Sequence, residues 1–160
     1  MAHTLKNSTY WFANKGDKGV DAVTETTGPK GHAGVDVGML VKLSKTIKHT
    51  DMVDAGATGT FTFDQSIPVG ATVIEVVCKD VVKFDGDTSA VIIVGDGTDT
   101  NRYNTGTPNV FADNAYLSLG AISGQTYHDV AKAPVVTVTT NADFTSVSAG
   151  SLTLDIYYIK

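Results

Sequence analysis

The stretch VIIVGDGTDTNRY, residues 91–103, is where the sequence comes nearest to a ligand-binding loop. An apolar run ends in Gly95-Asp96-Gly97 and continues into a polar turn. A phosphate-binding loop needs a glycine-rich turn that ends in Lys-Ser/Thr and leads into a helix. This stretch has no lysine, no helical period follows it, and Asp96 would repel phosphate. The dinucleotide fingerprint also fails, because its third glycine and its helix are absent.

Calcium is the other chemistry that this stretch suggests. Asp96, Thr98, Asp99 and Asn101 offer oxygen atoms at short spacing, and hard cations prefer oxygen ligands. The spacing is not that of an EF-hand, however, and the bidentate glutamate is missing. Asp and Asn side chains also commonly bond their own backbone in turns. We therefore predict a structural turn capped by Asp96, Asp99 and Asn101, with no metal and no cofactor, and keep a calcium loop as the alternative.

Catalytic constellations are absent from the sequence pattern. No histidine lies within metal-ligand spacing of another, and zinc normally needs three or four convergent ligands. The single cysteine, Cys78, falls in the middle of an apolar strand pattern, where a thiol acts as a small hydrophobe. There is no Gly-x-Ser-x-Gly elbow. The chain is predicted not to be an enzyme; the alternative is a small hydrolase or lyase built on His49 and His128.

Composition indicates a protein that buries surface against neighbours. Charged residues are only 18% of the chain, below the usual quarter. The net charge is -5 and no run of Lys or Arg occurs, which excludes the footprint of a nucleic-acid partner or a polybasic membrane patch. The spaced set Lys42, Lys45 and Lys48 predicts the solvated side of one element, with a contact to an acidic partner as the alternative.

Neither a membrane span nor a signal peptide is predicted. No stretch approaches the roughly 18 apolar residues of a span, and MAHTLKNSTYWFANKG lacks the apolar run of a signal peptide. We expect synthesis in a cytoplasm.

Residues 1–38 differ from the remainder of the chain. They hold six glycines and few apolar residues without period, so ordering this backbone is costly. An extended arm is predicted, ordered only where it lies on something else. Its one aromatic cluster, Tyr10, Trp11 and Phe12, is expected to anchor the arm on a partner; the alternative is that these rings fold back onto their own domain.

From residue 39 onward the pattern is that of strands. Apolar residues alternate with polar ones, Val, Thr and Ile are abundant, and Gly, Pro, Asp and Asn separate the runs. The inward-facing positions are predicted to be Val41, Leu43, Ile47, Phe61, Phe63, Ile74, Val76, Cys78, Val82, Leu152, Leu154, Ile156 and Tyr158. No segment has a convincing helical period. The prediction is an all-β fold, an antiparallel jelly-roll-like β-sandwich over 39–160, with the extended N-terminal arm before it.

The order of several segments resembles the small β-sandwich proteins of tailed-bacteriophage virions, the capsid decoration or cement proteins and related head structural proteins. The resemblance rests on IKHTDM, then FTFDQSIPVGATVIEVVCKDVVKFDGD, then VIIVGDGTDTNRY and finally SLTLDIYYIK. It spans roughly residues 42–160. These segments are strand ends and turns and do not form an active-site motif.

The resemblance implies structural work in a virion. Cement proteins bind the outer surface of the capsid, often as trimers, and clamp adjacent subunits of the major capsid protein. We accordingly expect a homotrimer on the capsid exterior, made in the cytoplasm of a bacterial host. Arg102 and Tyr103, just past the turn, are the candidate subunit contacts. The alternative is a phage fibre, adhesin or glycan-binding module, with Tyr103, Tyr116 and Tyr127 as candidate sugar contacts.

Overall fold

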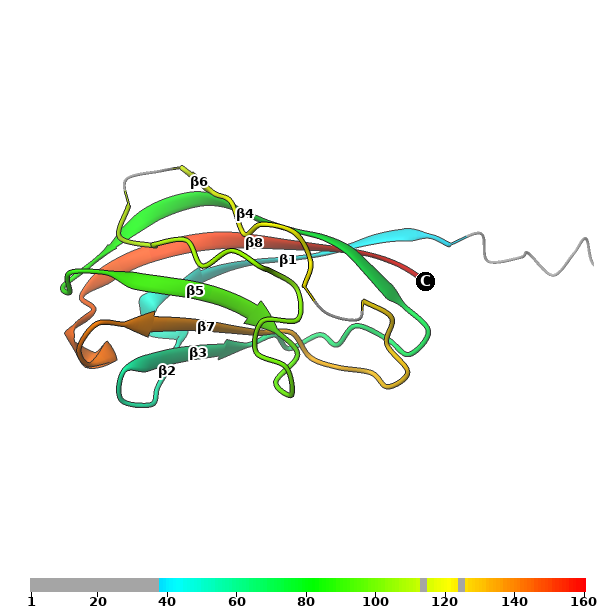
Figure 1. Cartoon of the computed structure of the whole chain (residues 1–160), viewed down its shortest axis with the longest axis horizontal. Helices are drawn as coiled ribbons and strands as arrows, with labels where there is room; N and C mark the ends of the chain where they lie inside the picture. Colours follow the sequence, from blue (N-terminus) through cyan, green and yellow to red (C-terminus); the bar gives the residue numbers. More distant parts are fainter. Residues whose placement is uncertain (1–37, 113–114, 124–125) are drawn as a thin grey trace, which may run out of the picture. The chain divides into compact units, whose positions relative to one another are not determined.

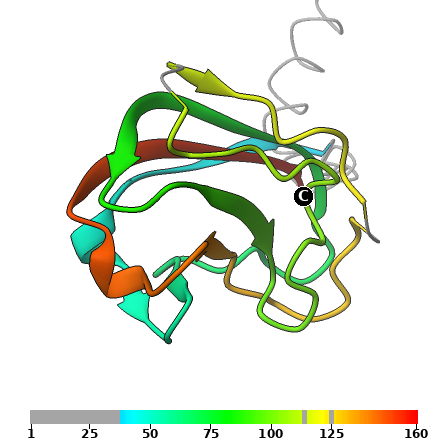
Figure 2. The same ribbon diagram turned by 60° about the vertical axis from the view of Figure 1, so that its left-hand side comes forward.

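Two four-stranded antiparallel sheets pack face to face as a sandwich in the computed structural model, which describes residues 38–112, 115–123 and 126–160 (Figures 1 and 2). The strand orders are β1-β8-β4-β6 and β2-β3-β7-β5. The strands are β1 (Leu40–Lys48), β2 (Val53–Asp54), β3 (Thr58–Thr62), β4 (Thr72–Asp85), β5 (Ala90–Gly95), β6 (Tyr116–Leu117), β7 (Val135–Thr140) and β8 (Ala149–Ile159), with the short 3-10 turns η2 (His49–Asp51) and η3 (Phe144–Ser146). The predicted all-β sandwich is confirmed.

The pairing is nested as in a jelly roll. The first strand pairs with the last (β1 with β8), β3 pairs with β7, and β4 pairs with β6, always antiparallel. The outer edge of β5 is bonded by the segment that follows it, through Ile92 N–H to Pro108 O (3.1 Å) and Val110 N–H to Ala90 O (2.9 Å). The chain thus forms one long antiparallel hairpin that folds over on itself, which is the topology of a jelly roll.

Period-two alternation builds the core between the sheets. On β8, Leu152, Leu154, Ile156 and Tyr158 are all buried, and on β1 Leu43 and Ile47 are buried, as predicted. Facing them from the other sheet are Ile92 and Val94 of β5 and Val136 and Val138 of β7, each fully buried. Because alternate side chains of a strand point to opposite faces, polar residues at the intervening positions stay outside.

The alternation predicted for β4 is wrong at both ends of the strand. Ile74 and Val82, expected inside, are 46% and 60% exposed, while Val73 is buried. Pairing of β4 with β8 shifts register three times, between Val73 and Glu75, between Lys79 and Val82, and between Val82 and Asp85. Each β-bulge inserts an extra residue and so reverses which side chains face the core.

A strained residue marks the second bulge. Asp80 has φ +50°, the one non-glycine residue with positive φ among those described. Beyond it Phe84 is the buried side chain of the strand, 1% exposed. The bulges let a strand of fourteen residues bend over the sandwich, as Figure 2 shows.

Lys45 also departs from the sequence prediction. It shares the inward phase of β1 with Leu43 and Ile47, whereas Lys42 and Lys48 face outward. Its ammonium lies 3.6 Å from the Asp64 carboxylate and 5.6 Å from the centre of the Phe61 ring. The three lysines therefore do not form one solvated face. Within the described ranges, no helix is long and apolar enough to span a membrane.

Because of the bulges in β4, we predict that the same substitution has different effects on the free energy of unfolding at two valines of this strand. Val73→Thr places a hydroxyl in the core and should lower the free energy of unfolding by about 1–3 kcal/mol. Val82→Thr changes an exposed side chain and should stay within about 0.5 kcal/mol of wild type. Urea denaturation of both variants measures the difference. A larger loss for Val82→Thr than for Val73→Thr would mean that β4 keeps one phase along its length, because uninterrupted alternation puts these two side chains on opposite faces.

Candidate functional site

The turn after β5 is built around two glycines with different tasks. At Gly95 an added Cβ would lie 2.0 Å from the carbonyl oxygen of Asp99, so only glycine lets the returning chain approach so closely. Gly97 has φ +79°, the left-handed region that glycine enters without strain. Asp96 N–H then bonds Asp99 O at 3.1 Å and closes the turn. Backbone demands thus explain the Gly-Asp-Gly sequence.

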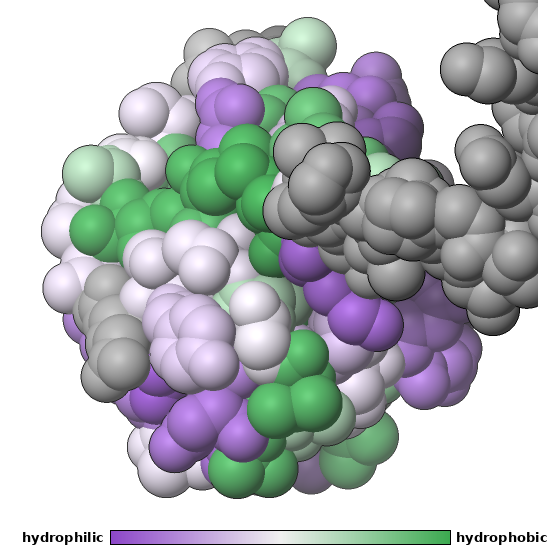
Figure 3. All heavy atoms as spheres, turned by 90° about the vertical axis from the view of Figure 1, so that its right-hand side faces the viewer, coloured by the Kyte–Doolittle hydropathy of each residue, from purple (hydrophilic) through white to green (hydrophobic). Residues whose placement is uncertain are grey.

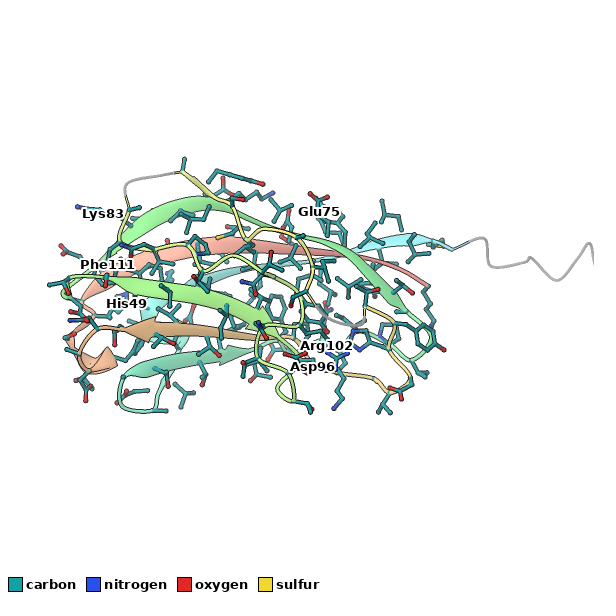
Figure 4. The ribbon with its side chains drawn as sticks, viewed as in Figure 1. His49, Glu75, Lys83, Asp96, Arg102 and Phe111 are labelled. Atoms are coloured by element: carbon teal, nitrogen blue, oxygen red, sulfur yellow. The ribbon has the colours of Figure 1, made fainter. Side chains whose placement is uncertain are left out.

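Asp96 holds the turn with both carboxylate oxygens. Oδ1 accepts the N–H groups of Thr98 (3.0 Å) and Asp99 (2.8 Å), and Oδ2 forms an ion pair with Arg102 Nε at 2.9 Å. The Asp96 side chain is 1% exposed, and Figure 4 shows it beside Arg102. Burial would raise the pKa of this carboxyl, but the two N–H groups and the Arg102 and Lys132 charges outweigh it, and the pKa lies below its ordinary value.

Capping of the turn by Asp96 and Asp99 is confirmed. Asp99 Oδ1 accepts the N–H of Asn101 at 3.3 Å. Asn101 contributes its backbone: its carbonyl accepts the N–H of Asn104 at 3.2 Å and the Ser123 hydroxyl. Asn104 in turn accepts the N–H of Val94 on its side-chain oxygen at 2.7 Å, which ties the loop to β5.

The surroundings of the turn disfavour a cation. Asp96 already faces N–H groups and a guanidinium, and Lys132 Nζ donates to Thr98 Oγ1 at 2.9 Å. A calcium ion at these oxygens would have to displace Arg102 and sit beside a second positive charge. Across the described part of the chain, no group of three His, Cys, Asp or Glu side chains is placed to hold a metal ion.

Tyr103 and His128 form a buried pair behind the turn. Tyr103 is 1% exposed and His128 is 2% exposed, and the Tyr103 hydroxyl lies 2.9 Å from His128 Nε2. Burial raises the pKa of Tyr103 above its ordinary value, so its hydroxyl keeps its proton. Burial lowers the pKa of His128, and the Arg102 charge lowers it further.

Burial weighs against Tyr103 as a direct contact with another subunit. Its ring lies in the core cluster of the sandwich. The Arg102 side chain, 21% exposed, remains a candidate contact whose guanidinium is already engaged with Asp96. The arm residues Tyr10, Trp11 and Phe12 lie outside the described residues.

The residues of the hydrolase alternative do not meet. His49 lies on η2 at the opposite end of the sandwich from Asp96 and Arg102, as Figure 4 shows, whereas His128 contacts Tyr103 beside that turn. Cys78 is fully buried on the inner face of β4, and burial raises its pKa to about 12. Its thiol is therefore neutral and enclosed, and its predicted structural role is confirmed.

A buried carboxylate on the outer face of β8 escaped the sequence analysis. Asp155 is 1% exposed, yet its phase on the strand is outward. Lys79 Nζ lies 2.8 Å and Lys42 Nζ 3.5 Å from Oδ2, and the Ser44 hydroxyl donates to Oδ1. Burial would raise the pKa of Asp155, but these hydrogen bonds and charges hold it below the ordinary value. The available signal was one acid in an otherwise apolar and hydroxyl-rich strand; its partners follow only from the register.

Exposed apolar side chains gather at the end of the sandwich where β1 begins and β8 ends. Leu40 pairs with Ile159, which also pairs with Thr72, and Tyr127 bridges to Thr72. The exposed apolar and aromatic residues around this row, 39% to 70% exposed, are Met39, Leu40, Val69, Ile74, Tyr127, Val130 and Ile159. Figure 3 views this end and shows apolar groups interspersed with polar ones.

A separate hollow lies between β4 and the segment that follows β6. It has a volume of about 410 Å³ and is lined by Ile74, Glu75, Tyr116 and Ile122, among others. Tyr116 is 58% exposed. It lies opposite Lys79 in the β4–β6 register. An exposed aromatic ring beside a carboxylate is a combination that suits a polar ring-shaped ligand such as a sugar.

The ion pair of the turn predicts measurable coupling between its two charges. Asp96→Asn keeps the oxygen that caps the turn, and Arg102→Met keeps the aliphatic stem. Each variant alone leaves one charge poorly compensated, so the double variant should lose less stability than the sum of the two. A double-mutant cycle by urea denaturation should give a coupling of about 0.5–3 kcal/mol. Additive losses would show that the pair contributes nothing.

His128 predicts a pH dependence of stability near neutrality. Its pKa is lowered in the folded protein. The unfolded chain therefore binds more protons as pH falls below about 6.5, and the free energy of unfolding must fall with it. The slope due to this group is at most about 1.4 kcal/mol per pH unit. Denaturation between pH 7.5 and 5 should show this slope for wild type and a smaller one for His128→Gln. Equal slopes would contradict the assignment.

Comparison with known proteins finds a similar solved structure but no matching protein family. A chain of the cyanophage Pam1 capsid asymmetric unit is similar to this one, with a TM-score of 0.55 and 20% sequence identity. The match covers 76% of this chain and 85% of that chain. No protein-family model and no curated protein matches the sequence. At this identity the likeness demonstrates a shared fold, a β-sandwich that is also present in a phage capsid.

Proposed function

We propose that this chain is a structural protein of a tailed-phage virion, bound to the outer surface of the capsid, where it cements adjacent subunits of the major capsid protein. The observation that carries the proposal is the shared fold with a chain of the Pam1 capsid asymmetric unit, which extends over 85% of that chain. The match therefore involves nearly the whole of that capsid chain. The segments that resemble decoration proteins lie within the same domain.

The chemistry of the loop after β5 supports a structural role. Its polar side chains are used internally: Asp96 caps the turn and pairs with Arg102, and Tyr103 bonds His128. These bonds fix the shape of the loop without leaving a nucleophile or base poised toward solvent. A rigid loop of this kind suits a particle component that must keep its shape under load.

The exposed apolar end of the sandwich supports a partner. Met39, which directly precedes β1, is 70% exposed, and Leu40, the first residue of β1, is 61% exposed. Exposed apolar side chains gathered at one end of a domain, with polar groups among them, commonly mark an interaction site. In the proposed assembly this end is covered by protein, and the low content of charged residues agrees with extensive contact.

The glycine-rich arm, residues 1–38, is the second part of the proposed attachment. We propose that Tyr10, Trp11 and Phe12 dock on the shell across a subunit boundary. Ordering such a segment costs entropy, which wide apolar contact offsets. Because many copies would sit on one lattice, and because we propose a homotrimer, each single contact can be weak.

Removal of the arm, residues 1–38, tests this attachment. The truncated protein should keep the sandwich, with an unchanged far-UV circular dichroism spectrum, and should lose at least tenfold in binding to purified capsids of the phage that encodes it. Co-sedimentation of full-length and truncated protein with the same shells measures the loss, and sedimentation velocity of the free protein measures the trimer. Undiminished occupancy after truncation would remove the arm from the proposal, and failure of the full-length protein to bind would remove the capsid role.

A fibre, adhesin or glycan-binding module is the second candidate, favoured by one observation. Tyr116 is exposed beside the 410 Å³ hollow that Glu75 also lines. Immunogold micrographs separate the two functions: a cement protein decorates heads, whereas an adhesin lies on tails or fibres.

A further inference from the structure

Among the described residues, none makes a backbone hydrogen bond to the outer edge of β1. Met39 and Lys160 exchange hydrogen bonds, Met39 N–H to Lys160 O at 3.0 Å and Lys160 N–H to Met39 O at 3.3 Å. In an antiparallel ladder such bonded pairs alternate with non-bonded ones. The register of β1 with β8 then turns the N–H and C=O groups of Leu40, Lys42, Ser44 and Thr46 away from β8. Because β1 is an edge strand of its sheet, these groups point away from the sheet.

The other edges of the two sheets are short or covered. The edge strands β2 and β6 have two residues each. The edge of β5 is bonded by the following segment, including Tyr103 N–H to Val94 O at 3.0 Å. Over the described ranges, the nine-residue strand β1 is thus the one long open edge. An edge of this length is a template for a further strand.

Two hollows adjoin this edge, along the seam where β1 faces the segment after β3. The larger, about 590 Å³, is lined by Val41, Leu43, Pro68 and Tyr158 together with polar neighbours. The smaller, about 270 Å³, is lined by Ser44, Lys45, Phe63, Asp64 and Gln65. A strand added to β1 would turn alternate side chains into this seam, apolar ones beside Val41 and Leu43.

The charges along β1 favour an acidic added strand over a second copy of β1. Lys42, Lys45 and Lys48 all lie on β1. Lys42 pairs with the buried Asp155 and Lys45 pairs with the exposed Asp64 at the seam, whereas Lys48 forms no ion pair among the described residues. Two copies of β1 joined edge to edge would bring two such sets of lysines together, and like charges on paired strands are destabilising. Lysines on an edge strand are a known defence against this self-pairing. Glutamate or aspartate on the added strand would instead lie beside Lys48 and could replace the exposed Asp64 as the partner of Lys45.

We infer that β1 is a strand-docking edge that accepts an extended acidic segment of another protein, with apolar side chains turned into the seam. The backbone of the segment bonds Leu40, Lys42, Ser44 and Thr46, and its carboxylates lie beside the lysines. Main-chain bonds supply affinity and the alternate side chains supply specificity in this mode of recognition. The partner need not be a capsid protein.

Hydrogen exchange on the wild-type, full-length protein gives a direct test. The probe is a soluble peptide of seven residues in which Val alternates with Glu or Thr, and the control peptide has Lys in place of Glu. Saturating acidic peptide should slow exchange of the amides of Leu40, Lys42, Ser44 and Thr46 at least fivefold. The amides of Val41, Leu43, Lys45 and Ile47 bond β8 and are protected in both states. Absence of added protection at the four edge amides, or equal protection by the Lys peptide, overturns the inference.

Variants of the edge give an independent readout by fluorescence anisotropy of the labelled acidic peptide. Thr46→Pro removes an N–H that makes no bond to β8, a position where proline is tolerated on an edge strand. It should weaken binding at least tenfold, whereas Thr46→Val, which loses the same hydroxyl but keeps the N–H, should not. Unchanged binding to folded Thr46→Pro contradicts the docking mode.

If Thr46→Pro does not fold, two charge-reversal variants give the same test. Lys48→Glu reverses a charge on β1, and Lys83→Glu makes the same change at an exposed position of β4. Lys48→Glu should weaken the acidic peptide roughly two- to fivefold, with an effect that shrinks in high salt. Equal effects of the two substitutions would mean that only net charge matters and would contradict docking at β1.

Discussion

The sandwich depends on the ladder that β8 makes with two strands at once. β8 pairs with β1 over nine residues and with β4 over most of its length, so the first and last strands of the domain are joined through the centre of one sheet. This double pairing turns Leu152, Leu154 and Ile156 into the core and aligns Lys42 and Lys79 over Asp155. It also sets which backbone groups of β1 remain for an outside partner. Core, charge cluster and open edge are three results of one register.

Much of this fold follows from short-range alternation in the sequence. In β8 and β1 a residue and its neighbour two positions on share a surface, and that rule alone places Tyr158 and Leu43 correctly. It fails in β4, where Val73 takes the place expected for Ile74, because a bulge depends on how the strand meets β8 rather than on its own composition. Asp155 is a similar case. Its partners come from strands far away in sequence, so its burial was beyond a reading of one strand at a time.

The polar turn after β5 illustrates how an apparent binding loop can be architectural. Its acids and arginine meet the criteria for ligand chemistry when they are read in sequence, and the cap formed by Asp96 was foreseen from the habits of such turns. The inward position of Tyr103 was not, because a tyrosine next to an arginine after a polar turn is usually taken as surface. Its hydroxyl could be buried only because His128, from a loop 25 residues later, supplies a partner. A buried hydroxyl without one would be costly.

The central place of β8 has a consequence for the timing of folding during synthesis. Residues 149–159 leave the ribosome after every other strand of the sandwich, yet β1 and β4 have no ladder to each other and meet only through β8. The sheet that holds them therefore cannot close while the nascent chain is still growing through this region. The opposite sheet, whose last strand is β7, is complete earlier and provides a surface that β8 can pack against. The domain would then form in two steps. The pairing of β8 completes it and at the same time covers the apolar side chains and strand edges through which the unfinished domain could aggregate.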